Sequence, residues 1–327
     1  MADGLPAERE TPLPGQLGGE TGKRGGIERL QKSLGRYGNA KGATLALLDA
    51  LGKERALVLG LRWSRIRECG DWLKFRHYYE RDLVKLVASN FCKNHLTCGV
   101  CAIRRGARGL AVYIEKAESV PGFGGSVVPV MSSVTVRNGD DLGERLRHLL
   151  VSYRRMLKRR HLGRGSLMDG VLGGVYSVEV TNVGNGWHPH IHAIWLVRLD
   201  ALPTTCQLRA EWELLTGDSF ECDISPMRAR VDLGDQVSPY AADFCEVFKY
   251  ATKPAELGAE LFAQAYPVLR ERRLLASFGC LRGVQVPESL ADDVSALDGE
   301  PYVEFLARYL AGRYRFARGE EVCNVEV

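Results

Sequence analysis

The run Gly-Trp-His-Pro-His-Ile-His-Ala-Ile-Trp-Leu-Val at 186–197 constrains the fold more than any other part of the chain. Its apolar, β-branched second half predicts a strand, and its first half carries His188, His190 and His192 at every second position. Side chains of a strand alternate between its two faces, so these three imidazoles share one face. Neutral imidazoles that converge in this way can hold a divalent metal.

A second strand is predicted over 172–182, joined to the histidine strand by a Gly-Asn-Gly turn centred on Asn185. With the turn at this position Glu179 lies between His190 and His192, and a one-residue shift in register puts it beside either. A carboxylate with two imidazoles suits Mg²⁺ or Mn²⁺ better than imidazoles alone. The hairpin therefore predicts a site for one of these ions.

The third ligand of that site has two candidates, Glu179 and His188. The alternative interpretation is a half-buried strand whose histidines face solvent or hydrogen-bond partners. That interpretation is adequate for one histidine, but it leaves three on one face unexplained.

The segment 240–253 has the apolar spacing of an amphipathic helix. One stripe is apolar and consists of Phe244, Val247, Phe248 and Ala251. The stripe beside it is polar and consists of Asp243, Glu246, Tyr250 and Lys253. Tyr can be a covalent nucleophile, Glu a general base and Lys a partner for phosphate. An ordinary helix with a solvated charged face is the alternative.

Cys98-x-x-Cys101 has the spacing of a zinc knuckle, and Cys92 lies six residues before Cys98. Cys69 is the candidate fourth ligand, with His95 as the alternative. The chain has 9 cysteines and begins with a polar segment that is unlike a signal peptide, so we expect thiols and metal ligands in a reducing cytoplasm rather than disulfides. Buried or free thiols are the alternative interpretation.

Basic residues cluster at two places in a chain whose net charge is only +4. Arg104 and Arg105 follow the cysteines directly, as expected if a knuckle contacts phosphates. The segment 145–164 carries eight basic residues and no acid, and we expect DNA contacts there from Arg154, Arg155, Lys158 and Arg159. A helix face that is merely solvated usually mixes both signs.

Three motifs now stand in order along the chain: a Thr-containing strand at 132–136, His190-Ile-His192, and Tyr250-x-x-Lys253. This set resembles the replication initiator (Rep) proteins of rolling-circle plasmids, which are His-hydrophobe-His (HUH) endonucleases. It is most similar to the branch with a Glu four residues before the nucleophilic Tyr, here Glu246 and Tyr250. The resemblance spans roughly residues 60–285.

The cysteine segment departs from the pattern of that branch in two ways. The interval from Cys92 to Cys98 has one residue more than usual, and Gly99 stands where a Pro is usual.

The resemblance implies an α+β fold with a central antiparallel sheet of about five strands and helices on one face, plus a small zinc-knuckle region. We therefore expect a disordered leader over 1–26, a helical and cysteine-rich region over 27–108, and the catalytic domain over 109–285. Residues 286–327 form a C-terminal extension whose role the sequence does not indicate.

The activity implied is nicking and rejoining of one strand of plasmid double-strand origin DNA. Tyr250 would form a 5′-phosphotyrosine link and leave a 3′-hydroxyl primer, Glu246 would activate a water, and Lys253 would steady the phosphate. The sequence shows no helicase motor, so we expect a host helicase and the host replication machinery as partners. The alternatives are a non-catalytic zinc-knuckle protein that binds nucleic acid, or a transposase or relaxase with the same HUH chemistry.

Overall fold

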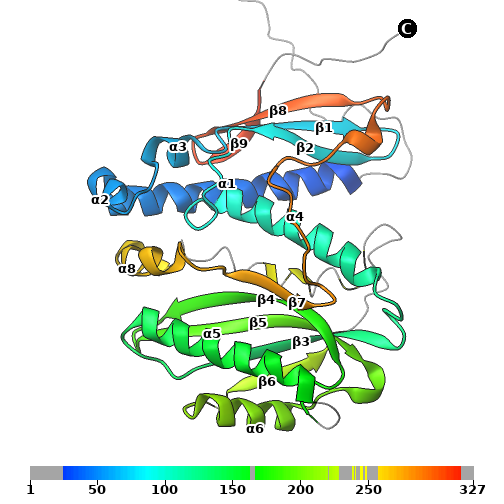
Figure 1. Ribbon diagram of the computed structural model, residues 1–327. Helices are drawn as coiled ribbons and strands as arrows, with labels where there is room; N and C mark the ends of the chain where they lie inside the picture. Colours follow the sequence, from blue (N-terminus) through cyan, green and yellow to red (C-terminus); the bar gives the residue numbers. More distant parts are fainter. Residues whose placement is uncertain are drawn as a thin grey trace, which may run out of the picture. The chain divides into compact units, whose positions relative to one another are not determined.

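The computed structural model describes residues 25–162, 166–219, 221–227, 238, 240, 244–245, 247–248 and 257–317. The chain divides into two compact units, drawn in Figure 1. Unit 1 takes its described residues from 25–39, 70–90 and 291–317, and unit 2 from 40–69 and 91–290. These units differ from the regions expected from the sequence, because the C-terminal segment shares a unit with the segment 70–90. The expected leader lies outside the described residues except for its last two, Gly25 and Gly26, which begin a helix.

The α-helices are α1 (Gly25–Leu51), α2 (Lys53–Val58), α3 (Trp63–Glu68), α4 (Gly99–Glu118), α5 (Leu142–Lys158), α6 (Thr205–Thr216) and α8 (Ala259–Leu269). The strands are β1 (Trp72–Tyr78), β2 (Leu83–Ser89), β3 (Val127–Thr135), β4 (Val171–Asn182), β5 (Trp187–Arg198), β6 (Cys222–Pro226), β7 (Leu275–Gly279), β8 (Val303–Leu310) and β9 (Arg313–Phe316). Short 3-10 helices are η1 (Arg159–Leu162), η2 (Leu199–Ala201) and η5 (Ser295–Leu297).

Unit 2 is built on a five-stranded sheet in the order β6-β3-β5-β4-β7, with every neighbouring pair antiparallel. The α+β class and the five-stranded antiparallel sheet predicted from the sequence are therefore confirmed. The histidine strand, β5, is the central strand, and β4 pairs with it through the predicted hairpin. Gly184 and Gly186 of the turn both have positive φ, which glycine adopts without strain.

Helices cover both faces of this sheet, whereas the sequence led us to expect them on one (Figure 1). Ile191 and Trp195 of β5 belong to a core with α5, α6 and α8. Ile194 and Leu196 point the other way and pack in a second core with α4 and Phe248. A central strand is buried on both sides, so its apolar residues run on continuously toward its end. The expectation of one covered face came from the family resemblance, whereas apolar residues on both faces of β5 are buried.

The sequence predicts α5 from a candidate cap at Asp140 or Asp141 and from the helical spacing of the apolar residues between Leu142 and Leu157. The Asp141 side chain accepts a hydrogen bond from the Glu144 amide at the helix start, at 2.9 Å. The predicted apolar stripe is buried and consists of Leu142, Leu146, Leu149, Leu150, Tyr153 and Met156. Trp195 of β5 donates to the buried Tyr153 hydroxyl at 3.1 Å, which fixes the helix to the sheet.

Unit 1 contains a four-stranded sheet in the order β2-β1-β8-β9, which the sequence analysis did not predict. Its two hairpins lie more than 200 residues apart in the sequence, and β1 pairs with β8 from Trp72↔Arg308 to His77↔Val303. The first half of α1 contributes buried Leu30, Leu34 and Tyr37. Among the described residues of both units, no helix is long and apolar enough to cross a membrane.

Candidate functional site

Glu179, His190 and His192 lie together on one face of the five-stranded sheet. In the β4–β5 ladder Glu179 stands opposite His190, a shift of one residue from the register predicted with the turn at Asn185, which placed it between His190 and His192. The Nε2 atoms of His190 and His192 lie 2.8 and 3.4 Å from Glu179 Oε2. Glu179 is buried, at 4% exposure, while both imidazoles are half-buried. The three donor atoms therefore converge at a point that is open on one side.

Hydrogen bonds at the far ring nitrogens orient both imidazoles. His192 Nδ1 lies 2.9 Å from Ser133 Oγ on β3, and His190 Nδ1 lies 3.4 Å from the His188 carbonyl oxygen. When these nitrogens donate, the Nε2 lone pairs face Glu179, which is the tautomer that a metal ligand needs. Sequence reasoning missed the role of Ser133. The observation that identifies Ser133 is the pairing of β3 with β5, which places this residue directly opposite His192.

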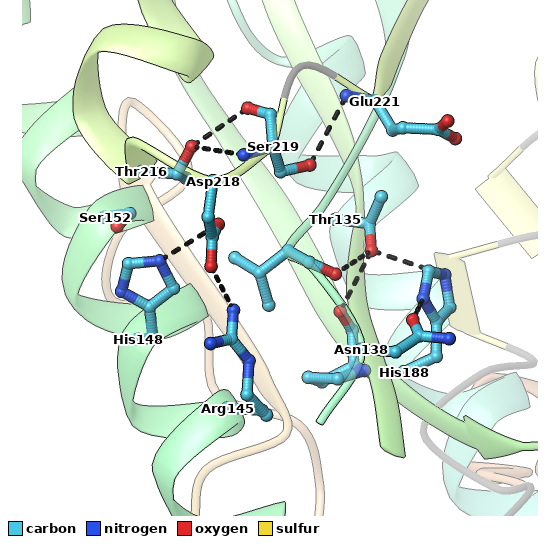
Figure 2. A network of polar contacts seen from close by, with 12 residues as sticks. Thr135, Asn138, Arg145, His148, Ser152, His188, Thr216, Asp218, Ser219 and Glu221 are labelled. Atoms are coloured by element: carbon cyan, nitrogen blue, oxygen red, sulfur yellow. Dashed lines mark hydrogen bonds and ion pairs between the residues drawn. The ribbon is translucent and has the colours of Figure 1, made fainter. Parts of the chain in front are cut away.

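His188 is on the same face but is engaged elsewhere, as Figure 2 shows. Its Nδ1 donates to the amide oxygen of Asn138, and its Nε2 lies 3.3 Å from the Thr135 hydroxyl. Burial, and then the neighbouring His190, lower the pKa of His188. Both ring nitrogens of His188 therefore have partners other than Glu179, and its donor atoms do not join the cluster formed by Glu179, His190 and His192 (the Glu179 group). The geometry thus favours Glu179 over His188 as the third donor.

The predicted catalytic side chains Glu246, Tyr250 and Lys253 lie outside the described residues. The apolar stripe before them is described in part: Phe244, Val247 and Phe248 are helical and buried. They pack in the core with Ile194 and Leu196 of β5. Because β5 residues at even positions share one face, this helical stretch lies on the same face of the sheet as His190 and His192.

Cys69, Cys92, Cys98 and Cys101 form a second cluster, in which all four side chains are buried. The Sγ atoms of Cys69 and Cys101 are 3.4 Å apart, those of Cys92 and Cys101 3.6 Å, and those of Cys98 and Cys69 3.5 Å. A tetrahedral zinc with bonds of 2.3 Å places its sulfurs about 3.8 Å apart. The four thiols therefore fit a tetrahedral site, with Cys69 rather than His95 as the fourth donor.

The four sulfurs also set one another's protonation. Hydrogen bonds from Cys101, Cys69 and Cys92 lower the pKa of Cys98. The contacts with its three neighbours, together with burial, raise the pKa of Cys101. Four thiols in mutual contact are an arrangement that a soft cation can complete by displacing their protons.

α1 supports the cysteine cluster from outside. The Lys41 ammonium, at 3% exposure, donates to the carbonyl oxygens of Arg67 and Cys69, each at 2.9 Å. A Cβ on Gly99 would come within 2.9 Å of Ala40, which explains why this position holds a residue without a side chain. Between Cys92 and Cys98, Lys93 adopts a φ of 61°. Sequence reasoning missed Lys41, whose only signal is a lone Lys amid the apolar side of an amphipathic helix.

The residues predicted to contact DNA differ in their exposure to solvent and in the partners that they already have. Arg104 is buried at 6% exposure and donates to the Leu290 carbonyl oxygen at 2.7 Å, so its guanidinium holds the fold and does not face outward. Arg159 forms an ion pair with Glu211 of α6. The residues Arg105, Arg154, Arg155 and Lys158 are half-buried or exposed. α5 packs on the face of the sheet opposite to His190, so its basic surface is remote from the Glu179 group.

A separate polar network joins α5 to the loop after α6 (Figure 2). Asp218 accepts from Arg145 and contacts His148 Nε2 at 3.3 Å. Burial opposes ionisation of Asp218, but Arg145 and His148 outweigh it and lower the pKa of this carboxyl group. Arg145, one of the eight basic residues of the segment 145–164, is therefore paired with Asp218.

Comparisons with known proteins give consistent results. A profile of the replication protein family matches residues 83–302. A "Protein rep" of Bacillus amyloliquefaciens is 27% identical over 176 residues, which are 51% of this chain and 49% of that protein. A "Protein rep" of a Bacillus species is 26% identical over 172 residues, or 50% of this chain and 52% of that protein. The chain thus spans about half the length of these relatives. No solved structure matches it.

Proposed function

We propose, on the premise that this chain belongs to the replication protein family, that it initiates plasmid rolling-circle replication by nicking and rejoining one DNA strand. The observation that carries the proposal is the convergence of Glu179, His190 and His192 on the sheet face that also receives the helical stretch preceding Tyr250. The "Protein rep" relatives support a replication role for the portion that they share with this chain.

The donor set of Glu179, His190 and His192 fits Mg²⁺ or Mn²⁺. An octahedral ion with ligands at about 2.1 Å places neighbouring donors about 3.0 Å apart, and the two His–Glu contacts are 2.8 and 3.4 Å. Three protein donors leave positions for water and a phosphate oxygen. When bound, such an ion polarises a phosphate oxygen and stabilises the charge that develops at phosphorus.

In the proposed reaction the Tyr250 oxygen attacks the scissile phosphorus of a single-stranded or extruded nick site. A Tyr–O–P bond forms and the bond from phosphorus to the 3′-oxygen breaks, and the released 3′-oxygen takes a proton to become the primer hydroxyl. Lys253 steadies the phosphate charge. Glu246 takes a proton from the water that later hydrolyses the link, which ends the cycle. The phosphotyrosine link keeps the energy of the broken phosphoester bond, so rejoining needs no further energy source.

The cysteine cluster is proposed to bind a structural Zn²⁺. All four donors are protein thiols and all are buried, so no position remains for a substrate. By holding Cys69 to the start of α4, the site would tie together segments that are far apart in the sequence. Its role in nicking would be indirect.

DNA outside the nick site is proposed to contact Arg105 and the exposed basic surface of α5, namely Arg154, Arg155 and Lys158. Arg159 remains a weaker candidate because of its ion pair with Glu211, and Arg104 is removed by its burial. A host helicase and the host replication machinery are the proposed partners for strand separation and synthesis, in the cytoplasm.

The decisive test is Tyr250→Phe, assayed with supercoiled plasmid and with a single-stranded origin oligonucleotide in the presence of Mn²⁺. The wild type should form a covalent protein–DNA adduct on a denaturing gel. The variant lacks the nucleophilic oxygen and should lose the adduct completely while binding DNA as before. A chelator should also abolish the adduct.

Two results would redirect the proposal. Residual cleavage by Tyr250→Phe would show that another group is the nucleophile. Tight DNA binding by the wild type with no cleavage of any candidate origin would favour a non-catalytic binding protein, while strand transfer between unrelated sites would favour a transposase or relaxase.

A further inference from the structure

One face of the four-stranded sheet in unit 1 is densely basic. Residues that stand opposite each other in antiparallel strands share a face, and the ladders pair Arg76 with Lys85, Arg308 with Arg315, and Leu310 with Arg313. Lys74 and Arg76 alternate with buried residues along β1. We call this surface the basic sheet face; its cations are Lys74, Arg76, Lys85, Arg308, Arg313 and Arg315.

The opposite face of the same sheet is the core of unit 1. Leu73, Phe75, Ala307 and Tyr314 are buried there, and the first half of α1 lies along that side (Figure 1). Gly38 of this helix is in contact distance of Tyr314. On the basic sheet face none of the named cations is buried, and Arg308, Arg313 and Arg315 are exposed. The sheet therefore has one filled side and one side on which, among the residues of its ladders, only Tyr78 at the end of β1 is buried.

The charge on the basic sheet face is nearly of one sign. Among the residues that the ladders place there, Glu304 is the single acid, and it bonds Lys74 Nζ at 2.6 Å and Arg76 Nε at 2.9 Å. The Arg76 guanidinium also stacks over the Tyr302 ring, 4.3 Å from its centroid. These contacts fix two cations in place and leave an excess of positive charge on the others. A fixed, extended, positive surface attracts a polyanion.

The β8–β9 hairpin presents three of these arginines. Its turn residues Ala311 and Gly312 both have positive φ, of 48° and 82°, as in a two-residue type I′ turn. Such a tight turn keeps the two strands in register, so Arg308 and Arg315 stand side by side and Arg313 follows at the tip. β8 also pairs with β1 from Val303 to Arg308, so only the tip of the hairpin beyond Arg308 is two-stranded. This tip is narrow enough for the major groove of duplex DNA, which is about 12 Å wide.

We propose that the basic sheet face binds the phosphate backbone of duplex DNA, with the β8–β9 hairpin as its leading element. The inference rests on the proposed function and assigns a role to the segment 291–317, which the sequence left without one. A duplex-binding surface is thereby assigned to unit 1, in addition to the α5 surface of unit 2, while the groups proposed for the chemistry belong to unit 2.

The test uses the full chain with fluorescein-labelled random-sequence probes of about 30 nucleotides, both duplex and single-stranded, titrated over a range of salt. The variant Arg308→Ala/Arg313→Ala/Arg315→Ala should bind the duplex about 10- to 100-fold more weakly, and its salt slope should fall by about 2 to 3, as expected for three lost phosphate contacts. The matched control is Lys53→Ala/Arg272→Ala/Arg282→Ala, which removes the same charge from three exposed positions of unit 2. It should bind within about twofold of the wild type.

A second variant, with lysine at the same three hairpin positions, keeps the charge and should bind the duplex nearly as the wild type does. Unchanged affinity and salt slope in the alanine variant would overturn the proposal, as would an equal loss in the control. A loss confined to the single-stranded probe would overturn the assignment to duplex DNA. If the wild type forms no covalent adduct but the duplex results hold, the proposed nicking fails while the basic sheet face stands.

Discussion

The cysteine cluster and the Glu179 group are both candidate metal sites, but they differ in how complete they are. The cysteine cluster supplies four buried thiols from a loop and a helix start, which completes a tetrahedron. The Glu179 group supplies three donors from two paired strands, and its imidazoles are half-buried. A closed site holds segments together, whereas an open site leaves room for a substrate. The difference predicts that mutations in the first change stability and those in the second change chemistry.

The largest effect is expected for Cys101→Ser. A structural zinc in such a site contributes about 10–16 kcal/mol of apparent binding energy, and a tetrahedral site that loses one thiolate gives up much of it. We expect the purified variant to contain less than one zinc per chain and to unfold at a much lower temperature, measured by metal analysis and circular dichroism.

The control for this change is Cys206→Ser, which alters an exposed free cysteine at the start of α6. It should retain both zinc and the unfolding temperature. If Cys101→Ser melts as the wild type does with full zinc content, the cluster is not a closed structural site and the comparison fails.

His192→Ala should have the opposite profile. Loss of one donor from an open site should reduce nicking about 10³-fold, or about 4 kcal/mol, and should abolish Mn²⁺ binding in a calorimetric titration. The unfolding temperature should change little, because the imidazole is half-buried and the strand is held by its ladder.

A paired comparison decides the third donor. Glu179→Gln should weaken Mn²⁺ binding much more than His188→Asn does, because both ring nitrogens of His188 are already hydrogen-bonded. The reverse order would mean that His188 turns toward the ion and that Asn138 and Thr135 hold it only in the absence of metal.

Local patterns were enough to predict the elements that build the catalytic sheet. The alternation of His188, His190 and His192, the cap at Asp141 and the apolar stripe of α5 each depend on residues within a few positions of one another. The pairing of β4 with β5 was also predictable from the short turn between them, but its register was predicted only to within one residue. The structure shifts it by one residue and places Glu179 opposite His190.

Features that depend on distant pairing were not predictable. The sheet of unit 1 forms only when β1 meets β8, and no local signal in either segment identifies the other. Ser133 became part of the site because β3 pairs with β5, and Lys41 because α1 passes the cysteine loop. Conversely, Arg104 followed the knuckle as a phosphate contact should, yet its position on α4 turns it inward to Leu290.

Lys41→Met tests the support of the closed site. The change removes two hydrogen bonds from a charged donor, to the carbonyl oxygens of Arg67 and Cys69, in a buried position. Bonds of this kind contribute about 1.5–3 kcal/mol each, so we expect the loss of both to lower the free energy of unfolding by about 3–6 kcal/mol in a denaturant titration. Zinc content should remain near one per chain, unlike in Cys101→Ser.

The matched control for that change is Lys32→Met, at an exposed position of the same helix. It should leave the free energy of unfolding within about 0.5 kcal/mol of the wild type. Equal values for the two variants would mean that the buried ammonium contributes nothing to the cluster.

Ser133→Ala tests the support of the open site, and we expect the smallest effect from it. The Ser133 hydroxyl fixes His192 through Nδ1, and loss of such a partner typically reduces metal affinity or activity 10- to 100-fold. Ser177→Ala is the control: Ser177 stands opposite His192 on the other neighbouring strand, is fully buried, and its Oγ has no hydrogen-bond partner among the described residues. Each variant removes one hydroxyl beside the same imidazole, so similar losses of Mn²⁺ affinity in both would point to packing. A loss confined to Ser133→Ala would assign the orientation of His192 to its hydrogen bond, and would show that the open site depends on ring orientation where the closed site depends on ligand number.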